Sequence, residues 1–444
     1  MLSLLIFLPL VLGIFIYFLN EEIIKIISSC FAFIIFALSV YCFLNGEFRF
    51  NYTLIKAFNF GINLRADNIS FILAITANFM LFVSLLFLNN HKKDFAISAM
   101  ILSACMNGLF LSNDALLFYI FWEVSLLPLL YLMAKDNLFD LAKKFFVFAF
   151  CGSIFMLVGI IYLAYEARVN GAFLNFDMGY FKPSDNVFLF LGFFLAFAIK
   201  APIFPFHSWA IKVYSKSNNF VSVMLASFKM APFGMIKFCV PLFSSVITEY
   251  SAFLNALFVI SALYAAILAF NAKNYKDLIA LSSISHLGII VLGIFSMHEN
   301  ALYGAVFYML SHAITSGGMF LYAEILKDNF KSYEGINSLA LKMPFLTFIF
   351  AIFLFSSISL PASANFIGEF LVLYGVFAKS KIIGAFATLI VIFSAIYMLN
   401  MFRNMFLSGD DRVILKVGFF RIFILSFLAF LIIYLGINPD FIRI

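Results

Sequence analysis

Apolar residues occur in long runs along the whole chain, and short polar segments separate these runs. About 20 residues of helix cross the hydrocarbon core of a bilayer, so each run of that length predicts one transmembrane helix. The runs predict about fourteen spans, at residues 2–19, 23–44, 67–90, 95–112, 114–134, 143–165, 187–209, 220–245, 251–270, 277–297, 301–326, 343–376, 382–407 and 417–437. The predicted fold class is therefore all-α, in a polytopic membrane protein.

The polar segments differ in their content of Lys and Arg. Segments that follow odd-numbered spans hold about twice as many of these residues as segments that follow even-numbered spans. Cytoplasmic loops are enriched in Lys and Arg. The pattern predicts a multi-pass protein of a bacterial inner membrane, with both termini on the outer face.

Composition excludes a soluble protein and several kinds of site. Hydrophobic residues make up 65% of the chain and charged residues 11%, whereas soluble domains are about 45–50% apolar and about 25% charged. The net charge of +6 is spread over the loops without a basic stripe, which argues against nucleic acid as a partner. The cysteines lack CxxC spacing, and no nucleotide-binding or catalytic-triad motif occurs. We therefore expect no metal site, no cofactor-binding residues and no catalytic residues in this chain.

Several ionisable residues nevertheless fall inside the predicted spans. A charge at the bilayer centre costs about 2.5–3.5 kcal/mol on insertion scales, so such residues face protein or water and mark ion paths. Lysine near a carboxylate, and histidine near neutral pH, readily take up and release protons. The predicted proton relay comprises Glu123, Lys200, Lys229, His286, His312 and Glu369, with His207 and Lys237 as further candidates.

Each of these residues also has a simpler interpretation. Glu123 and Lys200 could form a structural ion pair between two helices. Lys237 could extend to the outer interface while its stem stays in lipid. Each histidine could be a packing residue, and His207 could cap or anchor a helix. Glu324, at the end of its predicted span, is expected to be a solvated charge.

Prolines interrupt two of the predicted spans. Pro202 and Pro205 follow Lys200, and Pro361 precedes Glu369. Proline removes a backbone donor, and the freed carbonyls are tolerated at membrane depth where they line a wet or buried cavity. Prolines that merely kink single helices are the alternative.

Paired interruptions at corresponding positions are typical of transporters built from inverted repeats. They predict two inverted five-helix repeats with broken helices 7 and 12. The predicted division is residues 1–94 for helices 1–3, 95–245 for the first repeat, 246–407 for the second repeat and 408–444 for the last helix.

The segments around these residues resemble a known family. They are Phe121-Trp122-Glu123 with Pro128, Lys200 to Trp209, Lys229 with Gly234, Ser283 to Gly288, Ser311 to Gly318 and Leu360 to Phe370. The chain is similar over nearly its whole length to the antiporter-like subunits of respiratory complex I, the NADH–quinone oxidoreductase. That family is related to cation/proton antiporters and membrane-bound hydrogenases. Glutamate at position 369 resembles the M type (chain 4), because the other types tend to carry lysine there.

The resemblance implies a role for each relay residue. Glu123 and Lys200 would form the ion pair of an inward half-channel, and Lys229 would be the central lysine. His286 and His312 would continue the hydrated axis toward Glu369, the terminal group of the outward half-channel. The chain would act as a subunit of a proton-pumping translocase, beside other membrane-arm subunits that include neighbouring antiporter-like subunits. NADH, flavin, iron–sulfur clusters and quinone would then bind partner subunits.

Two departures leave other functions open. The family usually reads Leu-Pro-Asp-Ala-His after the tryptophan, whereas this chain continues from Ala210 without that proline and acid. After Lys229 comes Met230-Ala231-Pro232, and this proline is expected to kink the span. A subunit of a multi-subunit sodium/proton antiporter, the membrane arm of a hydrogenase or formate hydrogenlyase, and a structural scaffold without pumping remain alternatives.

Overall fold

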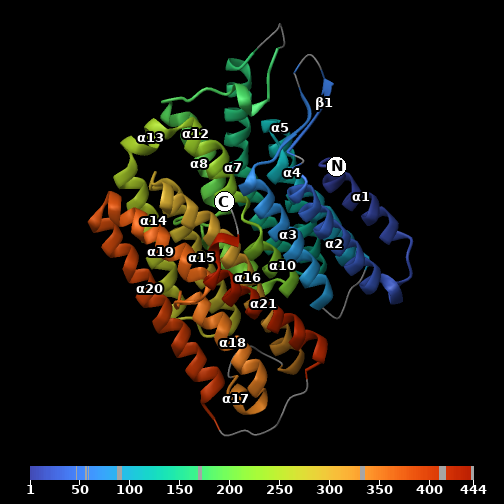
Figure 1. The fold of residues 1–444 in the computed structure, drawn as a ribbon, viewed down its shortest axis with the longest axis vertical. Coiled ribbons are helices and arrows are strands. Elements are labelled where there is room, and N and C mark those ends of the chain that lie inside the picture. The colour runs from blue at the N-terminus through green and yellow to red at the C-terminus, as the bar shows by residue number, and fades with distance from the viewer. Residues whose placement is uncertain are drawn as a thin grey trace. The chain divides into compact units, whose positions relative to one another are not determined.

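The computed structural model describes residues 1–46, 48–55, 58, 60–87, 93–168, 173–330, 336–409 and 417–441, and it is mostly α-helical (Figure 1). Each predicted span contains helix, although the end of the span at 67–90 lies outside the described residues. Among the described residues, ten helical segments are long and apolar enough to cross a membrane, and α1, α8 and α18 are shorter apolar helices. The polytopic all-α fold is therefore confirmed.

The chain divides into two compact units. Unit 1 comprises Met1–Lys200 and Phe228–Tyr250, and unit 2 comprises Ala201–Ser227 and Ser251–Ile444. The predicted division into two five-helix repeats flanked by terminal helices follows other boundaries and stays a prediction.

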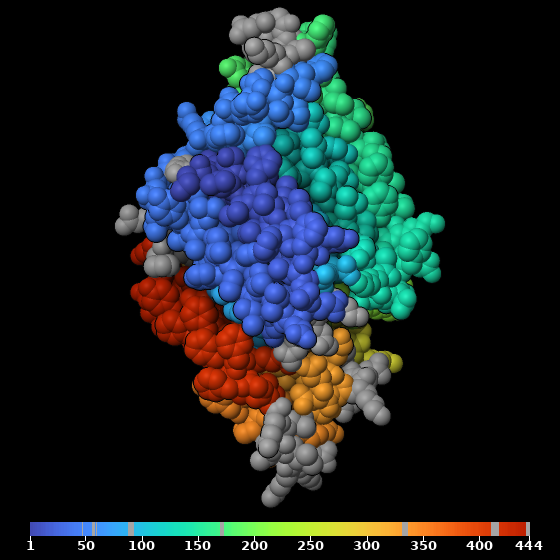
Figure 2. All heavy atoms as spheres, turned by 90° about the vertical axis from the view of Figure 1, so that its right-hand side faces the viewer, coloured from blue at the N-terminus to red at the C-terminus, as the bar shows by residue number. Residues whose placement is uncertain are grey.

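Unit 1 is a set of helices with one two-stranded sheet. Its elements are α1 (Leu4–Tyr17), α2 (Glu21–Leu44), β1 (Arg49–Ile55), β2 (Phe60–Arg65), α3 (Asn68–Phe87), α4 (Lys93–Leu111), α5 (Ala115–Val124), α6 (Leu126–Lys135), α7 (Phe139–Glu166), η2 (Met178–Tyr180), α8 (Val187–Lys200), α11 (Met230–Gly234), the π-helix η3 (Met235–Cys239), α12 (Val240–Leu242) and α13 (Ser244–Glu249). Figure 2 shows α1 and α2, in dark blue, on the surface of this unit. Apart from Glu21 and Glu22 at the start of α2, their large exposed side chains are apolar, which suits contact with lipid.

The sheet of unit 1 was not predicted from the sequence. Strands β1 and β2 pair antiparallel, with Arg49 opposite Arg65. Asp177 joins this hairpin to the helical part, because its carboxylate accepts hydrogen bonds from Asn63 at 3.0 Å and from Asn113 at 2.7 Å. Asp114, the residue after Asn113, caps α5. Its carboxylate accepts a hydrogen bond from the Leu117 amide at 2.9 Å, as expected for an aspartate at a helix start.

Unit 2 holds the longest helix of the described residues, α16. Its elements are α9 (Ser208–Lys216), α10 (Asn219–Ser227), α14 (Ser251–Phe270), α15 (Tyr275–Phe295), α16 (Glu299–Asn329), α17 (Leu339–Lys342), α18 (Pro344–Ser357), α19 (Ala364–Lys379), α20 (Lys381–Phe402), the π-helix η4 (Arg403–Leu407), α21 (Phe419–Ile437) and η5 (Pro439–Phe441). Helix α15 is buried along its length, which is typical of a core helix, and the buried polar residues Ser282 and His286 lie on it. It packs against α14, α16 and α19.

Helices are interrupted at both predicted places. Helix α8 ends at Lys200 and helix resumes at Ser208, after Pro202 and Pro205. Helix α18 ends at Ser357, and α19 begins at Ala364, after Pro361. The predicted span at 220–245 is also interrupted, and Lys229 has non-helical backbone between α10 and α11. The predicted kink in this span is therefore a full break, which lies just before Pro232 rather than at it.

Candidate functional site

Helices α16 and α19 approach each other closely in unit 2. A Cβ atom on Gly304 of α16 would lie 2.8 Å from the Gly368 carbonyl oxygen, and one on Gly368 of α19 would lie 2.8 Å from the Tyr308 Cα. Real Cβ atoms do not come that close to backbone, so glycine is required at both positions. The close approach lets Tyr308 on α16 reach the neighbouring residue Glu369 on α19.

A buried chain of hydrogen bonds joins three helices around Tyr308. Its hydroxyl lies 2.6 Å from Nδ1 of His286 on α15 and 3.4 Å from Oε2 of Glu369 on α19. All three side chains are at most 2% exposed. A phenol has a single proton, which it can donate to either neighbour while it accepts from the other. The geometry can therefore transfer a proton between the imidazole and the carboxylate through the tyrosine.

The interruption between α18 and α19 supplies a second donor to Glu369. The hydroxyl of Ser359 donates to Oε2 of this carboxylate. Helix α18 ends in a Schellman motif, with the Leu360 amide bonded to the Phe355 carbonyl and the Ser359 amide bonded to the Ser356 carbonyl, both at 2.9 Å. This motif needs a left-handed residue, and Ser359 has φ 54°. Such a conformation costs roughly 1 kcal/mol or more for a residue with a Cβ.

His312 lies beside the same chain. Its ring centroid is 5.5 Å from that of His286 and 6.2 Å from that of Tyr308. The hydroxyl of Ser357 lies 3.4 Å from the other ring nitrogen of His286. The structure thus brings together three of the predicted relay residues, His286, His312 and Glu369, within unit 2.

Glu123 and Lys200 are neighbours in unit 1, but they do not touch. Among the described residues, no ion pair within 4.0 Å joins them, although their charges attract each other. The Lys200 ammonium lies over the Trp122 ring, 4.6 Å from its centroid, and its Nζ has no hydrogen-bond partner among the described residues. An aromatic face attracts a cation without accepting its protons. Lys200 is therefore held by charge and not by hydrogen bonds.

Lys229 is also in unit 1, 1% exposed, at the break before α11. The π-helix that follows α11 carries Lys237. The ammonium of this second lysine lies 4.0 Å from the Asp67 carboxylate, at the start of α3. A π-helical turn is rare and often marks a functional position. Because the Asp67 side chain is 58% exposed, this pairing agrees with the interpretation that Lys237 extends toward the interface.

His207 makes packing contacts in unit 2. Its ring centroid is 5.8 Å from that of Phe204 and 5.1 Å from that of Tyr264. The geometry agrees with the anchoring interpretation.

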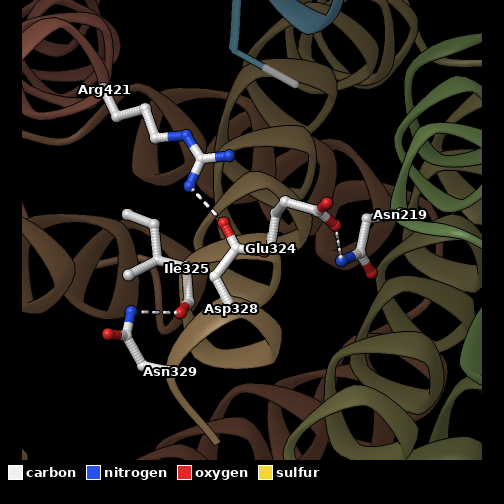
Figure 3. Close-up of polar contacts among 6 residues, drawn as sticks. All are labelled: Asn219, Glu324, Ile325, Asp328, Asn329 and Arg421. Atoms are coloured by element: carbon white, nitrogen blue, oxygen red, sulfur yellow. Dashed lines mark hydrogen bonds and ion pairs between the residues drawn. The ribbon is translucent and has the colours of Figure 1, made fainter. Parts of the chain in front are cut away.

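Glu324 is not simply solvated, contrary to expectation. It accepts a hydrogen bond of 2.5 Å from the amide of Asn219, because α10 packs beside α16 (Figure 3). One turn further along α16, Asp328 binds the guanidinium of Arg421 on α21 at 2.5 Å (Figure 3). These contacts fasten three helices at one end of unit 2.

Tyr308 and Ser359 were not predicted from the sequence. Tyr308 precedes His312 by four residues, a spacing that places both on one helical face, and this signal was available. Ser359 gave no such signal, because its role depends on the left-handed turn. Among the described residues, no three His, Cys, Asp or Glu side chains are grouped so that they could hold a metal.

Comparison with known proteins places these features in a family. A family described as "NADH:quinone oxidoreductase/Mrp antiporter, TM" matches residues 112–396. The NADH-quinone oxidoreductase subunit M of Rickettsia prowazekii (strain Madrid E) is 31% identical, over 99% of this chain and 95% of that protein.

Two solved structures are similar in fold. A chain of respiratory complex I from Thermus thermophilus, solved with bound NADH, superposes with a TM-score of 0.92 at 26% identity, over 100% of this chain and 96% of that chain. A chain of the Mrp complex from Dietzia sp. DQ12-45-1b has a TM-score of 0.87 at 16% identity, over 99% of this chain and 94% of that chain, which shows the fold alone. With a match of this extent, the chain belongs to the family of membrane-spanning subunits of NADH:quinone oxidoreductases and Mrp antiporters.

Proposed function

We propose that this chain carries protons across the inner membrane as a membrane-arm subunit of a respiratory NADH–quinone oxidoreductase. The similarity to a relative named subunit M of such an enzyme, over nearly the full length of both chains, supports this assignment. The observation that carries the mechanism is the buried chain from His286 through Tyr308 to Glu369.

The proposed route uses both units. Glu123 and Lys200 take up a proton and pass it to Lys229 in unit 1. His286 and His312 then receive it in unit 2, and Glu369 releases it outward. The breaks at Lys200, Lys229 and Pro361 support this route, because irregular backbone at membrane depth is tolerated where it borders a wet or buried path. Pro202 and Pro205 contribute to the first break.

Electron transfer elsewhere in the complex drives this movement. NADH, flavin, iron–sulfur clusters and quinone bind partner subunits, and neighbouring antiporter-like subunits flank this one. Both termini face outward, as the distribution of Lys and Arg predicts.

The test is the substitution Lys229→Met in the intact complex. Inverted membrane vesicles are supplied with NADH, and proton uptake is followed by the quenching of a pH-sensitive dye, with assembly checked by co-purification in mild detergent. We expect Lys229→Met to assemble and to lose about half or more of its proton uptake, because the route through unit 1 then lacks one of its proton carriers.

Lys342→Met is the matched control, since this lysine is also buried, at 9% exposure, but takes no part in the proposed route. Uptake equal to wild type in Lys229→Met would reject the proposal in favour of a structural scaffold. Loss of uptake in both variants would show only that buried lysines are needed for folding. Lys229→Arg then decides, because arginine keeps the charge but does not release a proton, and uptake restored by arginine would reject the relay.

A subunit of a sodium/proton antiporter is the second candidate, favoured by the shared fold with a chain of the Mrp complex. This function needs no electron donor. Vesicles given an imposed proton gradient and sodium, but no NADH, would exchange the two ions if it were correct.

A further inference from the structure

A cavity of about 290 Å³ lies in unit 2, where the start of α15, residues 336–337 and the end of α20 meet. Its polar lining consists of Lys273, Asn274, Asn337, Tyr397, Asn400 and Asn404. Lys273 and Asn404 are exposed, whereas Tyr397 is buried at 1%. The cavity therefore runs from the surface of the unit down to a tyrosine in the core, and its polar lining suits water.

The Tyr397 hydroxyl connects this cavity to a second one. It donates a hydrogen bond of 3.0 Å to Oγ of Ser282 on α15. Ser282 lines a small cavity of about 10 Å³, which His286, His312, Ser316 and Asn365 also line. Oγ of Ser316 and Nδ2 of Asn365 are buried without a hydrogen-bond partner among the described residues. A space of about 10–15 Å³ with two or more polar partners holds one water molecule.

The small cavity reaches the hydrogen-bonded chain already described. His286 lines it and is bonded through Tyr308 to Glu369. Each group between the large cavity and the carboxylate has an exchangeable proton, and each also has a lone pair to accept one. All of them belong to unit 2.

We propose that protons enter unit 2 directly from the large cavity, through Tyr397, Ser282 and one water molecule, and reach Glu369 by way of His286 and Tyr308. This route rests on the proposed function and adds to it an entry that does not require transfer from Lys229. A proton joins the Tyr397 oxygen from cavity water while the original hydroxyl proton leaves toward Ser282, so the tyrosine stays neutral after each transfer. The Lys and Arg pattern predicts that the cavity faces the cytoplasm, since Lys273 and Arg403 lie at this end.

The first test is Tyr397→Phe, which keeps the ring and removes the hydroxyl. We expect proton uptake by NADH-supplied inverted vesicles to fall by up to about half, because the transfer through Tyr397 is lost while entry through Lys229 continues. Tyr322→Phe is the matched control. Tyr322 is equally buried in the same unit, but its hydroxyl has no hydrogen-bond partner among the described residues, so we expect no change in uptake. Wild-type uptake in Tyr397→Phe would overturn the inference.

A second test probes the cavity without altering the tyrosine. In a chain with Cys30→Ser and Cys151→Ser, which removes the exposed thiols, Asn400→Cys places a thiol in the cavity lining. A membrane-impermeant, positively charged methanethiosulfonate should lower uptake in inverted vesicles of this variant. Leu399→Cys is the control, because residue 399 is exposed and does not line the cavity.

The outcomes separate this inference from the proposed function. Normal uptake after modification of Asn400→Cys, or modification only in right-side-out vesicles, would refute entry from the cytoplasm through this cavity. Neither result would affect the proton-carrying function, which fails only if Lys229→Met pumps normally. If Tyr397→Phe does not assemble, the cysteine experiment decides alone.

Discussion

The interrupted helices at Lys200 and at Glu369 hold opposite charges by different means. Lys200 is the last residue of α8, where the helix dipole favours a cation, and its ammonium rests on the Trp122 ring without a hydrogen bond. Glu369 lies inside α19 and accepts hydrogen bonds from the hydroxyls of Tyr308 and Ser359.

This difference indicates that the sites around Lys200 and Glu369 have different functions. A lysine held only by charge and an aromatic face responds to any movement of a nearby carboxylate such as Glu123, because Coulomb interactions are strong in a poorly solvated site. A carboxylate within a hydrogen-bonded chain instead exchanges protons over short, fixed distances. Unit 1 is therefore suited to sensing charge, and unit 2 is suited to conducting protons.

The largest expected effect comes from removing the carboxylate of Glu369, the last group in the hydrogen-bonded series of unit 2. Glu369→Gln keeps an oxygen that accepts from Tyr308 and Ser359, but it cannot carry a proton. We expect proton uptake by NADH-supplied vesicles to fall at least about tenfold, because a missing transfer raises the barrier by more than about 1.4 kcal/mol. Glu299→Gln, at the exposed start of α16, should pump like wild type. Wild-type proton uptake in Glu369→Gln would show that this carboxylate does not conduct protons.

A smaller effect is expected from substitution of Trp122, which belongs to unit 1. Trp122→Phe keeps an aromatic face of weaker attraction, and Trp122→Leu removes it. A cation–π contact is worth about 0.5–2 kcal/mol, so uptake through Lys200 should fall about 2- to 30-fold in Trp122→Leu and less in Trp122→Phe. Initial rates of dye quenching measure both. Equal rates in the two variants would mean that the indole only fills space.

Two residues with left-handed backbone, Ser359 and Ala362, lie in the turn before α19, and only Ser359 has a hydroxyl that binds Glu369. Ser359→Gly relieves the left-handed backbone but removes the hydroxyl on Glu369, whereas Ala362→Gly relieves a residue at φ 73° with no hydroxyl to lose. Relief of roughly 1 kcal/mol of strain should raise the melting temperature of the purified complex in Ala362→Gly, whereas in Ser359→Gly the lost hydrogen bond to buried Glu369 offsets this gain. Only Ser359→Gly should slow proton uptake. Slower uptake in Ala362→Gly as well would point to the shape of the turn rather than to the serine.

The smallest effect is expected at the ion pair between α16 and α21. Arg421→Met removes the partner of Asp328, whose side chain is 42% exposed. The Arg421 side chain is 10% exposed, but the carboxylate that remains after its removal is open to solvent. Loss of the pair should therefore cost about 1 kcal/mol or less, with a slightly lower melting temperature and a smaller difference in high salt. Proton uptake should stay at the wild-type level. A loss of uptake here would extend the functional region beyond the chain around Glu369.

The candidate site was only partly predictable from the sequence. Glu123, Lys200, Lys229, His286, His312 and Glu369 stand out because charges and imidazoles are costly inside apolar runs. Tyr308 could have been recognised from its spacing to His312, but tyrosine is common in such helices and carries no signal by itself. Ser359 and the pairing of Tyr397 with Ser282 depend on helices distant in the chain, so local sequence could not reveal them.

Sequence by itself determined that this protein is a bundle of membrane-spanning helices, that two helices break near Pro202 and Pro361, and which ionisable residues lie within the spans. These properties follow from local hydrophobicity and from proline, which act on the chain without reference to its neighbours. Only the tertiary structure decided which helices approach through Gly304 and Gly368, and that Tyr308 lies between His286 and Glu369. The reason is that side-chain contacts across helices depend on distances of a few ångströms, which periodicity along one helix does not specify.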